Sequence, residues 1–294
     1  MISRLACLLF ASGAAAASLA ASDSKYLFVF GDSYTSTGFS ITGAKPSAAN
    51  PLGNPALPGN TMAGGMTWVG HLATEHNTSL TLAYDFAVAG ATVDNSIVAA
   101  FSSSIPSVVE QVGTFTKNLV PAPASAPWTA DDALFAVWIG VNDVGNSYTK
   151  AAAAETALVN KDLDQYFAQL AILYKAGARH FALLNIPPTQ KTPFMKGQSN
   201  VASLVTTITD WNGQLATRVA TFVAANTEAN VTLVDTQAPW NKAIANPTDY
   251  GATDATCVNA NGKSCLWFNT YHPAQAIQKL VAQAVADAFK GTFF

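Results

Sequence analysis

The chain has 294 residues and a formal net charge of −3; half of the residues are hydrophobic and 11% are charged. This length allows one large hydrophobic core, and the composition excludes a disordered chain. The sequence contains no block of basic residues, so we expect no nucleic-acid partner.

Residues 1–20 have the pattern of a secretory signal peptide. Arg4 precedes the apolar run from Leu5 to Phe10, an alanine-rich stretch follows, and Ser18-Leu19-Ala20 places small residues at the offsets that cleavage requires. We therefore expect a secreted, extracellular protein. No second long apolar stretch follows, so we expect no membrane span.

The first element of the remaining chain is an uncharged run from Tyr26 to Phe30, which predicts a buried parallel strand. The run stops at Gly31, and Asp32 and Ser33 follow. A serine on the turn after the first strand lies at the carboxyl edge of the sheet, where open α/β folds build their sites. Ser33 is therefore a candidate nucleophile, although the same residues would also suit a helix N-cap without chemistry.

Apolar strands and helical patterns alternate along the rest of the chain. Residues 41–65 are rich in Pro, Gly, Asn and Ala, which predicts a long loop at the rim of a pocket. The pattern predicts one α/β domain over residues 22–294, with a five-stranded parallel sheet and helices on both faces. The further strands are expected at residues 80–88, 133–139, 180–186 and 231–235, and the helices at residues 67–75, 105–119, 151–176, 201–225 and 273–289.

Three strand ends carry residues that suit ester hydrolysis: Ser33, Gly90 and Asn142. In a parallel sheet these ends lie at one edge, so the three residues can converge. Hydrolysis by a serine requires a nucleophile, a base, and donors for the tetrahedral oxyanion. The N–H groups of Ser33 and Gly90 and the side-chain amide of Asn142 can supply those donors. Taken singly, Gly90 would be a tight turn and Asn142 an Asx-type turn.

The candidate base is one of four histidines. We expect His71 and His76, in or near a short helix, to face solvent, and His180 to begin a strand at the edge opposite the site. His272 comes just before the last helix, where it can reach the edge that carries Ser33.

Four blocks resemble, in order, those of the GDSL/SGNH hydrolase family: Gly31-Asp32-Ser33, Gly90, Gly140-x-Asn142-Asp143 and His272-Pro273. The longer strings from Phe30 to Phe39 and from Asp85 to Ala91 are similar to those of fungal acetylesterases of carbohydrate esterase family 16.

The resemblance implies a flavodoxin-like three-layer α/β/α sandwich. It also implies Ser33 as nucleophile, His272 as base, and an oxyanion hole formed by Ser33, Gly90 and Asn142. Enzymes of that kind remove acetyl groups from short plant-polysaccharide fragments, so the implied substrate is a small ester or an acetylated hemicellulose oligosaccharide.

One position departs from the family pattern. The family has an aspartate three residues before the histidine, where this chain has Asn269. An aspartate there orients the imidazole and stabilises its charged form, whereas an asparagine offers a carbonyl acceptor without charge. Asp249 or Asp254 in the preceding loop are alternative sources of the carboxylate. The sequence leaves three options: an asparagine-assisted site, a displaced aspartate, or a weakened enzyme.

Two other functions stay open. One is a lipase or phospholipase that acts on longer acyl chains. The other is a carbohydrate-binding protein that has lost most of its catalysis, for which Asn269 is the only support. No nucleotide-binding or metal-binding motif is present, so we expect no cofactor and no metal. The sequence does not predict an oligomeric state.

Two further features accompany a secreted protein. Cys257 and Cys265 are close enough in sequence to close a short disulfide loop. Asn77 and Asn230 each begin an Asn-x-Ser/Thr triplet and are candidate glycosylation sites.

Overall fold

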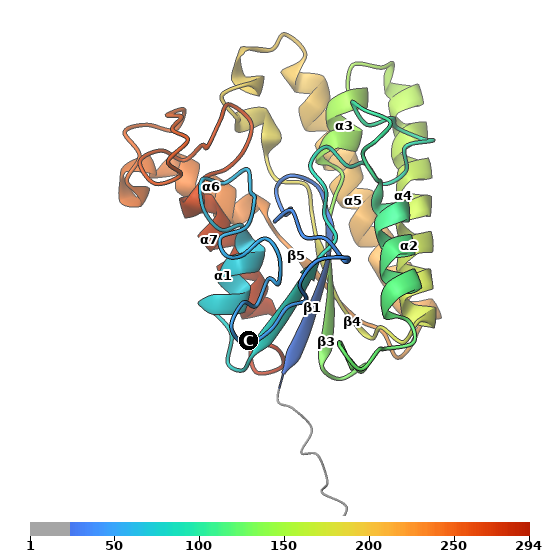
Figure 1. Cartoon of the computed structure of the whole chain (residues 1–294). Helices are drawn as coiled ribbons and strands as arrows, with labels where there is room; N and C mark the ends of the chain where they lie inside the picture. Colours follow the sequence, from blue (N-terminus) through green and yellow to red (C-terminus); the bar gives the residue numbers. More distant parts are fainter. Residues whose placement is uncertain (1–23) are drawn as a thin grey trace, which may run out of the picture.

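The computed structural model describes residues 24–294, so the expected signal segment 1–20 lies outside the described residues. A five-stranded sheet forms the centre of the molecule, with every strand pair parallel and the strand order β2-β1-β3-β4-β5 (Figure 1). The sequence-based expectation of a five-stranded parallel sheet is therefore confirmed. The strands are β1 (Lys25–Gly31), β2 (Thr81–Asp85), β3 (Ala133–Trp138), β4 (His180–Leu184) and β5 (Asn230–Val234).

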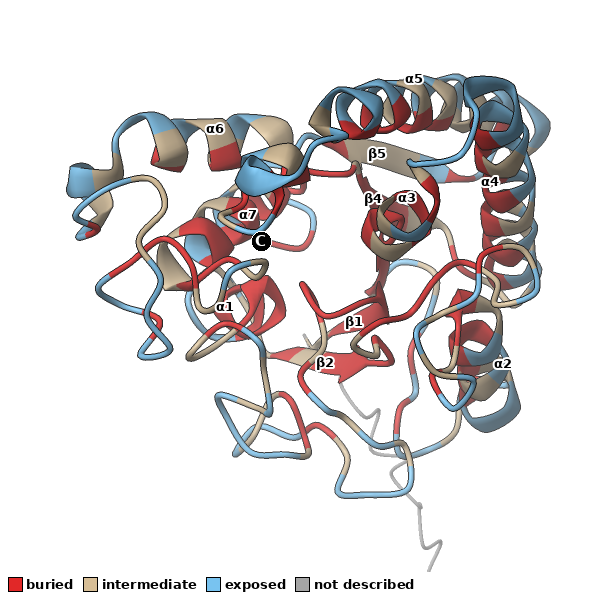
Figure 2. Cartoon of the chain, turned by 90° about the horizontal axis from the view of Figure 1, so that it is seen from above, coloured by how far each residue is buried: buried red, intermediate tan, exposed pale blue. Residues whose placement is uncertain are grey.

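Helices cover both faces of the sheet, which makes three layers (Figure 2). One face carries α1 (Trp68–Thr74), α6 (Gln237–Ala245) and α7 (Gln275–Ala288). The other face carries α2 (Val108–Leu119), α4 (Ala152–Lys175) and α5 (Val201–Ala225), and α3 (Val141–Ser147) follows β3 near α4 and α5. Short 3₁₀ turns occur at Thr189–Lys191 (η1), Met195–Gly197 (η2) and Pro247–Tyr250 (η3).

The core explains why the central strands are uncharged. All six residues of β3 are buried, as are the last six residues of β1. The ring of Phe28 in β1 lies 5.0 Å from that of Phe115 in α2 and 5.0 Å from that of Phe135 in β3. Because both faces of the strand are covered, no polar alternation interrupts the sequence.

The strand order places the candidate residues at one crevice. The chain passes from β1 to β2 on one side and then crosses to β3 on the other side of β1. Ligands of open α/β sheets bind beyond the carboxyl ends of strands at such a reversal. Ser33 follows β1 and Asn142 follows β3, so both lie at this point.

Several local expectations differ from the structure. The second strand ends at Asp85 instead of residue 88, although the N–H groups of Phe86 and Val88 still donate to the carbonyls of Val29 and Gly31 in β1. The sequence reading missed α3 and α6. Both are short, and α6 buries only Trp240 and Ala243, which gives little helical periodicity.

The expectation that His71 faces solvent is wrong. Its exposure is only 1%, because α1 packs against α7. The imidazole lies between the Gln275 amide oxygen at 3.1 Å and the Glu75 carboxylate at 3.1 Å. His180 begins β4, at the amino end of the strands, as expected.

The long loop over residues 41–65 contains no helix or strand, as expected. Its Pro51 carbonyl accepts the N–H of Ala83 in β2, so the loop covers the edge of the sheet. Within residues 24–294, no helix is both long and apolar enough to cross a membrane.

Candidate active site

Ser33 and His272 come from opposite ends of the described chain and form a hydrogen-bonded pair. Ser33 lies two residues after β1, and His272 lies three residues before α7. The Ser33 Oγ is 2.8 Å from the His272 Nε2, and the His272 Nδ1 is 2.9 Å from the Asn269 Oδ1. The geometry therefore aligns a hydroxyl, an imidazole and an amide oxygen in the order of a catalytic triad.

The hydrogen bonds of Asn269 fix which way its amide points. Its Oδ1 also accepts the backbone N–H groups of Tyr271 at 2.9 Å and of His272 at 2.8 Å. A backbone N–H can only donate, so the atom that receives both must be the oxygen. The Nδ1 of His272 must then carry the proton, and its Nε2 is free to accept the Ser33 hydroxyl proton. Asn269 thus selects the tautomer that a base requires.

Neither alternative carboxylate reaches the imidazole. Asp249 is exposed, and Asp254 accepts hydrogen bonds from the N–H and the hydroxyl of Thr256. Of the three options that the sequence left open, the geometry favours the asparagine-assisted site.

Burial lowers the pKa of His272 to about 4. The low-dielectric surroundings disfavour the charged imidazolium. The imidazole is therefore neutral near pH 7, and its Nε2 can accept a proton.

Candidate donors for an oxyanion lie on the segments that follow β1, β2 and β3. Within residues 24–294, neither the N–H of Ser33 nor that of Gly90 has a hydrogen-bond acceptor in the protein. The Asn142 Nδ2 donates one N–H to the Ala91 carbonyl at 2.8 Å, which orients the amide and leaves its second N–H available. Gly90 has a φ of 85°, a left-handed backbone conformation that favours glycine.

Two buried aspartates hold the segments that carry these donors. The Asp32 Oδ1 accepts the N–H of Tyr34 at 2.9 Å, which folds the turn around Ser33. The Asp143 Oδ1 accepts the N–H of Val93 at 2.8 Å, which ties α3 to the segment after Gly90. Burial raises the pKa of each carboxyl to about 7.

The structure also shows two glutamines that the sequence reading missed. Gln111 in α2 exchanges a pair of 2.9 Å hydrogen bonds with the N–H and carbonyl of Gly31. Gln278 in α7 accepts the N–H of Trp68 at 2.8 Å and donates to the Tyr34 carbonyl at 3.2 Å. Both fasten the turn that carries Ser33, and no local sequence pattern could have identified them.

A cavity of about 480 Å³ opens beside the site. Asn142 and Tyr271 form part of its wall, so it adjoins one candidate oxyanion donor and the loop that carries His272. Within residues 24–294, no group of three or more His, Cys, Asp and Glu side chains is arranged to hold a metal ion.

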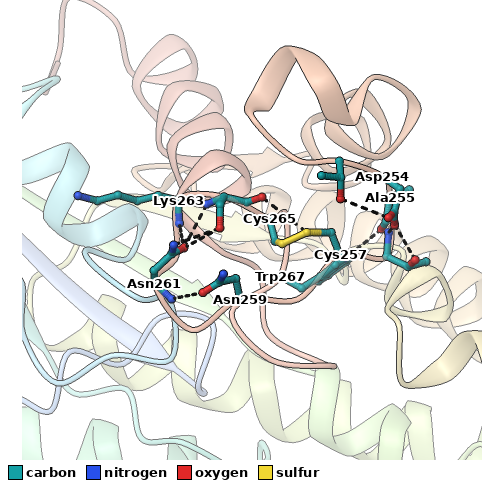
Figure 3. The surroundings of a disulfide bond; sticks show 11 residues. Asp254, Ala255, Cys257, Asn259, Asn261, Lys263, Cys265 and Trp267 are labelled. Atoms are coloured by element: carbon teal, nitrogen blue, oxygen red, sulfur yellow. Dashed lines mark hydrogen bonds between the residues drawn. A yellow bond between two sulfur atoms is a disulfide. The ribbon is translucent and has the colours of Figure 1, made fainter.

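Cys257 and Cys265 form a disulfide with a Cα–Cα distance of 5.0 Å (Figure 3). The bond closes part of the loop between α6 and α7, the same loop that carries Asn269 and His272. Trp267 is buried beneath it and donates its indole N–H to the Ala255 carbonyl at 2.7 Å. The disulfide and the buried Trp267 therefore both hold this loop in place.

The candidate glycosylation sites differ in exposure. Asn230 is exposed at the start of β5. Asn77 is half-buried, and its amide donates to the Ser79 carbonyl at 3.0 Å.

Comparisons with known proteins identify the family of the chain. Residues 27–285 match the family described as GDSL-like lipase/acylhydrolase. The chain is 51% identical over 273 residues to an acetylesterase of Thermothelomyces thermophilus, covering 92% of this chain and 90% of that protein. It is 26% identical over 321 residues to an acetylesterase of Hypocrea jecorina, with the same coverage of 92% and 90%.

Among solved structures, the fold is similar to that of a putative GDSL-like lipase from Parabacteroides merdae ATCC 43184, with a TM-score of 0.55 and 15% identity. The match covers 91% of this chain and 95% of that one. At this identity the likeness concerns the fold alone.

Proposed function

Because the chain belongs to the family of GDSL-like lipases and acylhydrolases, and is therefore a carboxylic ester hydrolase, we propose that it is a secreted serine esterase that removes acetyl groups. The proposed substrates are small acetyl esters, including acetylated oligosaccharides derived from hemicellulose. The observation that carries the proposal is the hydrogen-bonded series of Ser33, His272 and Asn269, with distances of 2.8 and 2.9 Å. The identity of 51% to an acetylesterase supports the choice of the acetyl group.

The first half of the reaction forms an acyl-enzyme. The His272 Nε2 accepts the Ser33 hydroxyl proton while the Oγ attacks the acetyl carbonyl carbon. The carbonyl oxygen becomes an oxyanion, which receives hydrogen bonds from the N–H groups of Ser33 and Gly90 and from the Asn142 amide. A single donor of this kind is worth about 3 kcal/mol of barrier. The protonated His272 then gives its proton to the departing alcohol oxygen, and the C–O bond of the ester breaks.

The second half hydrolyses the acyl-enzyme. A water molecule gives a proton to the His272 Nε2 and attacks the same carbonyl carbon. When the tetrahedral intermediate collapses, the Ser33 Oγ takes the proton back and acetate leaves. Asn269 holds the imidazole in the required tautomer through both halves, but contributes no negative charge to the imidazolium.

The test is hydrolysis of p-nitrophenyl acetate and p-nitrophenyl octanoate by the secreted protein. We expect faster turnover of the acetate, and its loss in Ser33→Ala. The matched control is Ser36→Ala, a half-buried serine of the same segment, which should keep the wild-type rate.

Each result decides between functions. Faster hydrolysis of the octanoate than of the acetate would mean that the protein is a lipase and not an acetylesterase. If neither ester is hydrolysed in a way that depends on Ser33, the esterase proposal is wrong. A carbohydrate-binding protein would then be the remaining function. Expression of the full chain in a fungal host, with activity retained in the cells and absent from the medium, would contradict secretion.

A further inference from the structure

Phe194 is an exposed aromatic side chain beside the site. Its exposure is 52%, although a phenylalanine normally belongs in the core. Its position is well defined, because its N–H donates to the Thr270 carbonyl at 2.8 Å and its ring meets that of Tyr271 edge to face at 6.0 Å. Thr270 and Tyr271 directly precede His272. The ring is thus fixed to the loop that carries the candidate base.

Phe194 forms part of the wall of the 480 Å³ cavity that adjoins Asn142. None of the residues that line this cavity is charged. They combine amides and hydroxyls with aromatic and aliphatic groups: Val141, Asn142, Gly145, Asn146, Tyr148, Phe194, Met195, Gln198, Leu204, Thr270 and Tyr271. A neutral wall of this kind suits a neutral ligand that carries several hydroxyl groups, and it offers no counter-ion to a charged one.

Two of the amides keep hydrogen-bonding capacity. The Asn146 Nδ2 donates to the Ala99 carbonyl at 3.2 Å, and the Gln198 Nε2 donates to the Phe194 carbonyl at 3.4 Å. Each bond uses one N–H, so each amide still has an oxygen and a second N–H for a ligand. Both side chains are exposed at the cavity.

The cavity adjoins the candidate site through Asn142 and Tyr271, and neither Ser33 nor His272 lines it. Asn142 is the proposed oxyanion donor, and Tyr271 precedes the histidine that gives its proton to the alcohol oxygen. A ligand in the cavity would therefore contact the loop that carries this proton donor. The volume falls within the range of small-molecule sites, about 300–1,000 Å³.

We propose that this cavity is the subsite for the pyranose ring that carries the acetyl group. Phe194 stacks on the apolar C–H face of the ring, and Asn146 and Gln198 bind its hydroxyl groups. The inference rests on the proposed acetylesterase function and names three residues that determine its specificity for the sugar.

The test compares an acetylated xylotriose with ethyl acetate, whose alcohol is too small to cover Phe194. We expect Phe194→Ala to lower the ratio of kcat/KM for the sugar ester to that for ethyl acetate by about tenfold, mainly through KM. Phe194→Trp should keep most of the ratio, because an indole also stacks. The matched control is Ile172→Ala: Ile172 is exposed by 42% in the last turns of α4, which approach the amino end of β4.

A second measurement does not depend on turnover. Calorimetric titration of Ser33→Ala with unacetylated xylotriose should show binding that the added Phe194→Ala change weakens by a similar factor. An unchanged ratio together with unchanged sugar affinity would overturn the proposal. So would an equal loss on both esters, which would mean that Phe194 only supports the loop. Loss of all ester hydrolysis in the wild type would instead overturn the proposed function, while the titration would still decide whether the cavity binds a sugar.

Discussion

Carboxylates hold the segments that follow β1 and β3, whereas a neutral amide holds the loop before α7. Asp32 and Asp143 each accept a backbone N–H behind the candidate nucleophile and the oxyanion donors. Asn269 accepts two backbone N–H groups and the imidazole N–H on the other side of the crevice. The two regions therefore hold their backbone with different acceptors, a carboxyl group in one and an amide oxygen in the other.

The difference shows where this chain uses negative charge. Burial raises the pKa of Asp32 and of Asp143 to about 7, so these groups do not provide a stable full charge near neutral pH. The pKa of His272 lies at about 4, and the group on its Nδ1 is uncharged. The site is therefore organised by the direction of hydrogen bonds more than by ion pairing.

The largest expected effect comes from removing the amide. Asn269→Leu leaves the His272 Nδ1 and two backbone N–H groups without their acceptor. The imidazole is then no longer held in the tautomer and the orientation that a base requires. We expect kcat on p-nitrophenyl acetate to fall by about 10³- to 10⁴-fold, by analogy with the loss of the orienting group in serine proteases. Asn246→Leu, an exposed asparagine after α6, is the matched control. Retention of a tenth of the activity in a folded Asn269→Leu protein would mean that another group orients His272.

The loop with the amide also depends on its disulfide. Replacing Cys257 and Cys265 by serine releases a loop with a sequence separation of 8, which should lower the free energy of unfolding by about 2–3 kcal/mol in the chain-entropy picture. Chemical denaturation of the double variant measures this. The reduced wild type should match the variant, and a stability equal to that of the oxidised wild type would show that packing around Trp267 suffices.

Replacing the Asn269 amide by a carboxylate would give the loop before α7 the same type of acceptor as the segments that follow β1 and β3. In Asn269→Asp the negative charge favours the imidazolium and raises the pKa of His272 above about 4, by roughly 1–3 units. The acid limb of the pH profile of kcat/KM should therefore move to higher pH. The rate above that limb should rise by up to about tenfold, since the charge stabilises the imidazolium of the transition state. If the acid limb does not move, it does not reflect the ionisation of His272.

The smallest effect concerns a carboxylate behind α3. Burial, then the charges of Asp143, Asp94 and Glu155, raises the pKa of Asp162 to about 9. Its folded pKa exceeds its unfolded value of 3.8, so the folded state binds the proton more tightly. The protonated Asp162 therefore contributes to the free energy of unfolding at low pH, and this contribution is lost as the pH rises from about 4 to about 9.

Asp162→Asn should therefore raise the melting temperature relative to the wild type at pH 9 more than at pH 5, by about 2 °C or more. Asp164→Asn, an exposed aspartate of the same helix, serves as the control. Equal shifts at both pH values would contradict a raised pKa of Asp162.

Much of the architecture is readable from local pattern. The uncharged run in β1, the long helices α4 and α5, and the alternation of strands and helices all follow from burial on a sheet covered on both faces. The residues that the sequence proposed for the site, Ser33, Gly90, Asn142, Asn269 and His272, follow strand ends or precede the last helix, and the structure places them at one edge.

The contacts that the sequence pattern did not predict join residues far apart in the chain. The clamp of Gln111 on Gly31 joins residues 80 apart, and that of Gln278 on Tyr34 joins residues 244 apart. Short helices such as α3 and α6 bury too few residues to produce a periodic signal. His71 looked like a surface residue because its burial depends on α7, which comes 200 residues later in the chain.

The sequence by itself determined the class of fold and the residue types of the site, because strand burial and motif spacing are local properties. Only the tertiary structure decided that Asn269, and neither Asp249 nor Asp254, meets the imidazole. That choice depends on how a loop between two helices folds back on its own N–H groups, and on a buried environment that lowers the pKa of His272 without a carboxylate beside it.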